Sequence, residues 1–328
     1  MILTGSTPPG EKTKTQFTDG DSLVAIQRSD AFEFAAFATL PMVNIQRGLY
    51  DKALVLVPLG VLAAGVLAFA VFILTRQQLT LISTLKVALK RREFSMVYQP
   101  IVDLQSGRWL GAEALVRWHR PAGETVPPDI FIKAAEDAGF IQDITAQVME
   151  MVGRDATQFF KRHRDFHIAI NLSSADLESP TTISALARLA AQTGAGNGNL
   201  LVEATERGFL EAEVVRDTLQ QIRSMGIQVA IDDFGTGYSS LSYLEDFELD
   251  SLKIDKSFVD TLGKDSATSQ VVPHIIEIAK SLKLIMIAEG VETEDQAQYL
   301  RDRGVQLAQG WLFARPMSFA ALNKRLGA

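Results

Sequence analysis

Acidic side chains recur within or just after short apolar runs from residue 95 onward. One such run is Gln228-Val229-Ala230-Ile231, which two aspartates follow directly. The acids in these positions are Glu113, Glu203, Glu206, Asp232, Asp233, Glu289 and Glu292. Asn171 ends another run, and Lys253 lies inside Leu252-Lys253-Ile254-Asp255. If the runs are strands whose ends meet, these side chains form one site. For any single acid, the alternative is a helix cap or a surface charge.

Convergent carboxylates would bind metal ions or protons, because like charges repel when they are brought together. The potential ligand atoms are oxygens, one of them from an amide, and the chain has no cysteine. This ligand set favours hard ions, so we expect Mg²⁺ or Mn²⁺. Two such ions about 3.5–4 Å apart can activate water and stabilise the leaving oxygen of a phosphodiester. The adjacent pair Asp232-Asp233 suits a bridging role between two ions.

Lys253 and a glycine-containing loop complete the candidate site. A lysine among acids could hold the attacking water or neutralise developing charge, and a structural ion pair is the alternative. The segment Asp233-Phe234-Gly235-Thr236-Gly237 follows a predicted strand directly, and its glycines permit close backbone approach to a ligand. This loop could therefore cover substrate or hold phosphate. The four histidines lack metal-ligand spacing, so we expect them to be structural or exposed; they are His119, His163, His167 and His274.

Strand-like and helix-like segments alternate from residue 95 onward. The predicted strands are 96–103, 110–118, 167–172, 200–205, 228–233, 251–255, 284–289 and 307–311. The predicted helices include 141–164, 183–192, 211–225, 269–282 and 294–301. This α/β pattern predicts a TIM-like (β/α)8 barrel, in which the strand ends converge on one mouth. Residues 104–108 read as a hairpin turn, so one strand is expected to be antiparallel. A doubly wound open sheet is the competing architecture.

The bulk composition excludes some classes of protein. The formal net charge of −7 argues against a partner that is a nucleic-acid polymer, which would require a basic face. A nucleotide held by metal ions remains compatible with this charge. Because it has no cysteine, the chain cannot itself provide disulfides, thiolate zinc sites or a cysteine nucleophile.

Residues 53–75 contain no charged side chain and are long enough to cross a membrane as a helix. A buried core helix is the alternative. Positive charge is denser after this segment, with Arg76, Lys86, Lys90, Arg91 and Arg92 downstream and only Arg47 and Lys52 close upstream. We therefore expect a single transmembrane helix whose C-terminal side is cytoplasmic. Gly60, Ala64 and Ala68 recur every four residues, a spacing that lets helices approach closely.

The segments on either side of this span predict different structures. Residues 1–20 are rich in Gly, Thr, Pro and Lys and are expected to be flexible, whereas 22–26 and 32–37 read as strands. So few strands cannot form a stable domain alone. We therefore interpret residues 1–50 as the remnant of an extracytoplasmic (periplasmic) sensor region of a longer protein. Residues 76–92 are expected to form a linker helix, in which Ile82, Leu85 and Leu89 fit either a short coiled coil or an amphipathic connector.

Eight short motifs follow one another between residues 88 and 325. They are Tyr98-Gln99-Pro100-Ile101, Glu113-Ala114-Leu115-Val116-Arg117-Trp118, Asn171-Leu172-Ser173, Glu203-Ala204-Thr205-Glu206, Asp232-Asp233-Phe234-Gly235-Thr236-Gly237, Leu252-Lys253-Ile254-Asp255, Ala288-Glu289-Gly290-Val291-Glu292 and Gln309-Gly310. Together they resemble the EAL family of cyclic di-GMP phosphodiesterases. The resemblance implies that residues 93–328 hydrolyse cyclic di-GMP to linear pGpG, in a protein of the bacterial inner membrane with a cytoplasmic catalytic domain. The N-terminal arrangement resembles the subgroup with a periplasmic redox-sensing domain, although its cysteine pair is absent here.

The resemblance also implies roles for individual residues. Glu113, Asn171, Glu203 and Asp232 would hold a first metal ion. Asp233 and Glu289 would serve a second ion, and Glu289 is a candidate general base. Lys253 would orient the attacking water, and Glu206 would steady the loop after the fifth strand. Gln99, Arg117, Glu292 and Gln309 would bind substrate or support its binding.

A catalytically weak receptor for cyclic di-GMP is the alternative to an enzyme. Such receptors typically lack metal ligands or the catalytic acid, whereas this chain has every one of them, which favours hydrolysis. The family often works as a homodimer through surfaces near the loop after the fifth strand. The sequence departs from the usual pattern at Ala204 and Trp311, and neither departure removes an expected ligand.

Overall fold

The computed structural model describes residues 14–28, 35–121, 123–209, 212–235, 247–263 and 270–327. The chain divides into two compact units, Met1–Gln77 and Gln78–Ala328. Each unit is described by itself below.

The first unit contains a three-stranded antiparallel sheet of β1 (Lys14–Asp19), β2 (Ser22–Arg28) and β3 (Ala35–Pro41). Gly20, with a φ of 53°, allows the tight turn between β1 and β2. The expectation of a flexible start was wrong for residues 14–19, because they pair in register with β2 from Lys14↔Gln27 to Asp19↔Ser22. Residues 1–13 and 32–34 lie outside the described residues.

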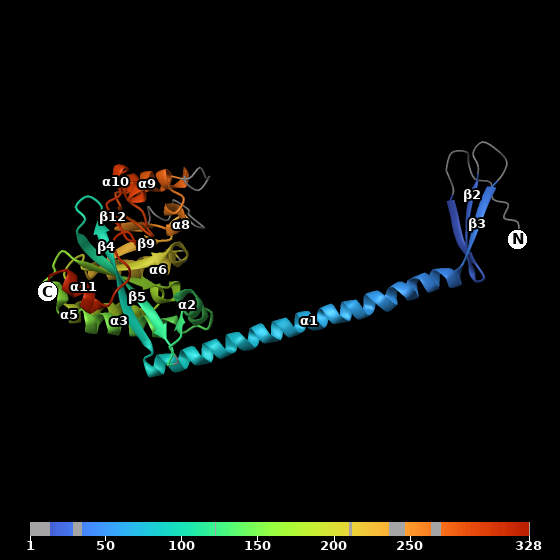
Figure 1. Ribbon diagram of the computed structural model, residues 1–328, viewed down its shortest axis with the longest axis horizontal. Coiled ribbons are helices and arrows are strands. Elements are labelled where there is room, and N and C mark those ends of the chain that lie inside the picture. Colours follow the sequence, from blue (N-terminus) through green and yellow to red (C-terminus); the bar gives the residue numbers. More distant parts are fainter. Residues whose placement is uncertain are drawn as a thin grey trace. The chain divides into compact units, whose positions relative to one another are not determined.

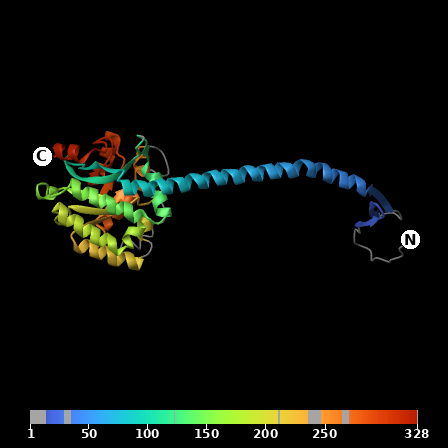
Figure 2. The same cartoon turned by 90° about the horizontal axis from the view of Figure 1, so that it is seen from below.

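Helix α1 runs from Met42 to Arg91 and is drawn as one continuous ribbon (Figure 2). Within it, Leu54–Ile73 is apolar enough and long enough to cross a membrane, with 20 residues, a mean hydropathy of 2.6 and none of its hydrophobic window buried. The buried core helix is therefore wrong for this segment. Pro58 lies inside the helix, where its ring removes one backbone hydrogen bond.

The second unit is a closed barrel of eight strands. They are β4 (Phe94–Asp103), β5 (Trp109–His119), β7 (His167–Leu172), β8 (Leu200–Thr205), β9 (Gln228–Asp232), β10 (Ser251–Ile254), β11 (Ile285–Ala288) and β12 (Leu307–Ala308). The ring order is β4-β12-β11-β10-β9-β8-β7-β5, and pairing of β4 with β5 closes it. The predicted barrel is confirmed, and the open doubly wound sheet is wrong.

One strand of the barrel is antiparallel, as predicted, and it is β4. It pairs antiparallel with β5 on one side and with β12 on the other, whereas the remaining neighbours in the ring pair in parallel. A short strand β6 (Thr125–Val126) adds to the outside of β5. The last strand is shorter than predicted because the backbone turns at Gly310, where a Cβ atom would lie 2.1 Å from the carbonyl oxygen of Val291.

Helices surround the barrel (Figure 1). They are α2 (Pro128–Asp137), α3 (Ile141–Asp155), α4 (Ser174–Leu177), α5 (Pro180–Thr193), α6 (Ala212–Ser224), α8 (Lys256–Val259), α9 (Val271–Ser281), α10 (Glu294–Asp302) and α11 (Phe319–Arg325), with 3-10 turns η1 (Phe159–Lys161) and η2 (Glu206–Phe209). Helices α3, α5 and α6 lie side by side along one flank. Helix α3 ends before the predicted residue 164, since Gln158 adopts a left-handed φ of 54°.

The end of α1 belongs to the second unit and packs on its core. Leu85 and Ala88 are fully buried, and Ile82 and Leu89 pack against the same core. Residues 82, 85 and 89 are therefore covered by the barrel domain. This supports the amphipathic connector and leaves no free seam for a coiled coil through these three residues.

Polar contacts fasten the same helix end to α3. The side chain of Gln147 donates to the carbonyl oxygen of Leu89 at 3.2 Å, and the Lys86 ammonium lies 5.2 Å from the centre of the Phe140 ring. Arg92, with a φ of 56°, ends the helix and places its guanidinium 3.2 Å from Glu150.

Candidate active site at the barrel mouth

Alternation along the strands places the candidate residues on the inner face of the barrel. An apolar layer of Ile101, Ala169, Leu201, Ala230, Ile287 and Leu307 forms its own buried cluster inside the ring. Side chains two residues apart on a strand point the same way. Asn171, Glu203, Asp232, Glu289 and Gln309 each lie two residues after a member of this layer, so they stand one layer nearer the mouth. Here the mouth is the end at which the parallel strands finish.

Lys253 occupies the centre of this polar layer, and its side chain is 1% exposed. Its Nζ lies 2.6 Å from Glu289 Oε1, 2.7 Å from Glu203 Oε2, 3.3 Å from Asp232 Oδ1 and 3.7 Å from Glu113 Oε2. These five residues are called the Lys253 cluster. Its four carboxylates come from β5, β8, β9 and the end of β11, so the fold gathers them from separate parts of the chain.

Two amide side chains hold the carboxylates in place. The Nδ2 of Asn171 donates to Glu113 Oε1 at 2.7 Å. The Nε2 of Gln309 donates to Glu113 Oε2 at 2.7 Å and to Glu289 Oε1 at 3.1 Å. Glu113 is thus bound through both oxygens, which fixes its orientation before any ligand arrives.

Burial and mutual repulsion divide the acids into two groups. Burial raises the pKa of Glu203 well above its usual value and that of Glu289 to about 8, with Lys253 opposing both shifts. Burial would also raise the pKa of Glu113, but Lys253, Gln309 and Asn171 together hold it below its usual value. One ammonium group cannot balance four buried carboxylates, so Glu203 and Glu289 favour protons while no other cation is bound.

The donor set fits a hard cation. Among the described residues, Glu203 Oε1 and Gln309 Oε1 are buried oxygens without a hydrogen-bond partner. Buried oxygens of this kind are expected to find a proton donor or a metal ion. Within the same described part of the chain, no three acids or histidines stand ready as a metal cage. The carboxylates instead turn toward Lys253, whose ammonium group supplies the local positive charge.

Asp233 extends the site toward solvent. Its φ of 54° is left-handed, a conformation that non-glycine residues rarely adopt, and its backbone N–H donates to Asp232 Oδ1 at 2.9 Å. This turn lets both adjacent aspartates line one groove. Burial, followed by the charge of Asp232, raises the pKa of Asp233 to about 6.

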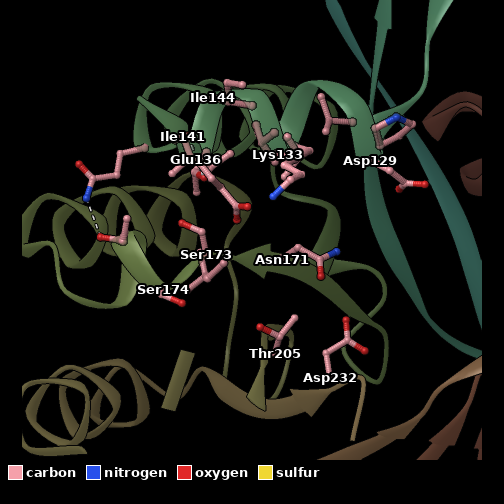
Figure 3. A pocket seen from close by; sticks show the side chains of 18 of the residues that line it. Asp129, Lys133, Glu136, Ile141, Ile144, Asn171, Ser173, Ser174, Thr205 and Asp232 are labelled. Carbon is pink, nitrogen blue, oxygen red and sulfur yellow. Dashed lines mark hydrogen bonds between the residues drawn. The ribbon is translucent and has the colours of Figure 1, made fainter. Parts of the chain in front are cut away.

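A groove of about 1080 Å³ opens beside Asp232 and Asp233. Its other wall is made by α2, α3 and the segment after β7, and Figure 3 shows Asn171, Thr205 and Asp232 facing Glu136 across the space. This volume lies just above the range for small-molecule sites, about 300–1,000 Å³. The groove can therefore accommodate a ligand larger than a mononucleotide next to the acids.

A family model described as EAL domain matches residues 82–316. The chain belongs to the EAL family. The matched range covers the barrel together with the buried end of α1, in agreement with the unit that begins at Gln78.

Named relatives and solved structures agree with this assignment. The chain is 38% identical over 273 residues to a probable cyclic di-GMP phosphodiesterase, PdeB of Escherichia coli, covering 83% of this chain and 52% of the relative. It is 38% identical over 231 residues to PdeN of the same organism, a second probable cyclic di-GMP phosphodiesterase, covering 70% of this chain and 45% of the relative. The chain thus spans about half the length of the curated relatives it matches.

Among solved structures, the PaMucR phosphodiesterase in complex with c-di-GMP has a TM-score of 0.69 and 34% identity, covering 74% of this chain and 99% of that one. The EAL enzyme Bd1971, bound to cAMP and cyclic di-GMP, has a TM-score of 0.73 and 29% identity, covering 89% of this chain and 81% of that one.

Not every residue expected in the site of this EAL domain joins the Lys253 cluster. Glu206 Oε1 accepts the backbone N–H of Gly235 at 3.0 Å, at the start of the loop whose residues 236–246 lie outside the described part. Glu292 contacts Lys256 at 2.7 Å on the rim. Arg117 lines the groove. Gln99 pairs in register with Glu113 across β4 and β5.

The groove wall formed by α2 was missed in the sequence. Pro127-Pro128 followed by Asp129 is a helix-start signal, because proline is favoured at the first helical position and an acid in the first turn. Ile132, Lys133 and Glu136 on this helix line the groove together with Ile144 and Thr145 of α3. None of these residues ends a strand, so the rule that located the acids could not find them.

Proposed function

We propose that this EAL domain hydrolyses cyclic di-GMP to linear pGpG. The observation that supports this most is the convergence of Glu113, Glu203, Asp232 and Glu289 on Lys253, beside a groove that also exposes Asp233. A buried site in which four carboxylates share one ammonium group suits metal-assisted attack on a phosphodiester. The relatives named above supply the substrate class.

The chain's own residues would bind two divalent ions. Phosphodiesterases of the EAL family generally use divalent metals. In our proposal Glu113, Asn171, Glu203 and Asp232 hold one ion, and Asp233 and Glu289 hold the other. Oxygen donors of this kind suit Mg²⁺ or Mn²⁺. When bound, such ions would lower the pKa of water and stabilise the leaving oxygen.

Three further roles follow from position. Lys253 lies within reach of four carboxylates, so it would orient the attacking water and balance charge as ligands bind. Glu289 would accept the proton of that water, since its carboxylate lies at the mouth within 2.6 Å of the Lys253 ammonium group. Gln309 would keep Glu289 and Glu113 aligned. Gln99, Arg117 and Glu292 would contact the substrate.

Activity of the purified chain tests this proposal against the receptor alternative. The full chain in detergent, with Mg²⁺ or Mn²⁺ and cyclic di-GMP, should form pGpG, measured by chromatography. The Glu113→Ala variant removes a carboxylate that three side chains contact, and should lose at least about 100-fold in kcat. Tight binding of cyclic di-GMP without pGpG would support the receptor instead.

We further propose that Leu54–Ile73 anchors the protein in the bacterial inner membrane, with the EAL domain in the cytoplasm. The length, apolar composition and exposure of this segment support the anchor, and the positive charge after it supports the orientation. The redox-sensing subgroup and a homodimer remain part of this proposal. Recovery of the chain in the soluble fraction without detergent would contradict the anchor, and a monomer in light scattering would contradict the dimer.

A further inference from the structure

The end of the groove away from the Lys253 cluster has its own chemistry. Its wall combines apolar side chains, Ile132, Ile141 and Ile144, with the carboxylate of Glu136. In Figure 3 the Glu136 side chain descends from α2 into the space opposite Ser173. One acid thus lies beside three isoleucines, with Lys133 and Ser173 also lining the space, in the groove that also reaches Asp232 and Asp233.

Glu136 has no fixed partner among the residues that the structure describes: neither a hydrogen bond nor a salt bridge reaches its carboxylate. The nearest cation on the helix, Lys133, is directed to Asp137 at 3.8 Å. Burial, followed by the charge of Asp137, raises the pKa of Glu136, and Lys133 opposes this shift only in part. Its two oxygens are therefore available to a ligand.

A carboxylate beside an apolar wall is suited to a flat base that has two adjacent hydrogen-bond donors. Guanine presents the N1–H and the 2-amino group side by side on its Watson–Crick edge, so both can donate to one carboxylate. Adenine presents a donor next to an acceptor on that edge, and the acceptor would face a negative oxygen. Charge-assisted pairs of this kind are stronger than neutral ones, and proteins read exposed bases through this edge while apolar side chains pack on the face.

We propose that Glu136 reads the Watson–Crick edge of one guanine of the bound cyclic dinucleotide, so that the outer end of the groove sets base specificity. This inference rests on the proposed hydrolysis of cyclic di-GMP, because it assumes that the scissile phosphate lies at the acidic end of the same groove. A site built to satisfy two donors discriminates against analogues that lack one of them.

Two variants on one helix separate a specific contact from a general effect of charge. Glu136→Gln removes one negative charge and turns an amide toward the guanine donors. Asp137→Asn removes the same charge at the next position, which does not line the groove. The two substrates are cyclic di-GMP and cyclic di-inosine monophosphate, which differ only in the 2-amino groups. Both variants and the full chain are assayed in detergent with Mn²⁺.

The Glu136→Gln variant should lose about 10- to 100-fold in kcat/KM for cyclic di-GMP, mainly through KM, and clearly less for the inosine analogue. The Glu136→Asp variant should recover part of the loss, and Asp137→Asn should behave as the parent. Equal losses on both substrates, or no loss, would overturn the assignment of Glu136. If the parent chain forms no pGpG, the proposed hydrolysis is wrong, but the role of Glu136 can still be tested. The dissociation constants of both dinucleotides, measured for the same variants, then decide that role.

Discussion

Strands β5 and β7 place polar side chains at both ends of the barrel, and these side chains have different surroundings at the two ends. At the mouth, Glu113 and Asn171 join a network of charges and amides around Lys253. At the base, His167 lies across from Gly111, where a Cβ atom would approach its ring to 2.2 Å. The His167 Nε2 is buried without a partner in the described structure, and burial lowers the pKa of this ring to about 4.

The difference separates folding from function. At the base, burial keeps the His167 ring neutral. The mouth keeps several ionisable groups close together although burial opposes their charges. Functional sites often hold such groups at a cost in stability. Substitutions at the mouth should therefore change activity whether they lower or raise stability, whereas substitutions at the base should act on stability alone.

The largest effect is expected from Lys253→Met. It leaves four carboxylates without their shared cation, so activity should fall by at least about 1000-fold, and the free energy of unfolding should fall by about 3–5 kcal/mol. Steady-state kinetics and urea unfolding measure the two effects. Near-normal turnover would show that the mouth does not depend on this charge.

Next comes Glu289→Gln, which should cost activity but not stability. In the metal-free protein, the pKa of Glu289 is raised from 4.5 to about 8. The folded state is therefore destabilised as the pH rises from about 4.5 to about 8, because the unfolded chain loses this proton first. The amide should lower kcat by at least about 100-fold and raise the unfolding free energy by about 1 kcal/mol at pH 7.5. Thermal unfolding in EDTA gives the second quantity. Lower stability would contradict the idea that this acid is strained in the metal-free site.

At the base, the expected effect depends on pH. The folded pKa of His167 lies below its unfolded value near 6.5, so the unfolded chain binds its proton first. The stability from neutral His167 is complete above pH 6.5 and is lost as the pH falls toward 4, by about 2 kcal/mol. His167→Phe should flatten the wild-type profile in this window, measured by urea unfolding, while kcat at pH 7.5 changes little. Parallel profiles would mean that the ring is not buried in its neutral form.

The smallest effect is expected from Lys256→Met on the rim. Its side chain is 46% exposed and pairs with Glu292 and Asp260, so its loss should change the unfolding free energy by less than about 1 kcal/mol. The same experiment tests Glu292, which the substitution releases from its salt bridge. A change of more than about 3-fold in KM would bring this rim pair into the substrate site.

The acids of the mouth could be predicted because two simple rules combine. Apolar runs mark buried strands, and parallel strands finish at one end of a barrel, so Glu203, Asp232 and Glu289 had to approach one another. The central place of Lys253 was harder to predict, since its four partners come from four strands.

Other features could not be predicted from local sequence. The pairing of residues 14–19 with β2 depends on the adjoining strand, so composition alone pointed to flexibility. Ile82, Leu85 and Leu89 have a spacing that fits both a coiled coil and an amphipathic connector. Only the surface that covers them, here the barrel domain, distinguishes the two. Glu136 sits on a helix and gains its place in the groove only through the packing of α2 beside α3.

The reversal of β4 determines where the chain enters the barrel. In a barrel of parallel strands alone, the first strand would begin at the closed base. Here Phe94, the first residue of β4, pairs with Trp118 near the C-terminal end of β5, so the chain arrives at the mouth. The indole N–H of Trp118 donates to Glu93 at 3.2 Å, immediately before that entry. A displacement of the incoming helix would therefore be felt beside Arg117 and the groove directly, without passing through the length of the barrel.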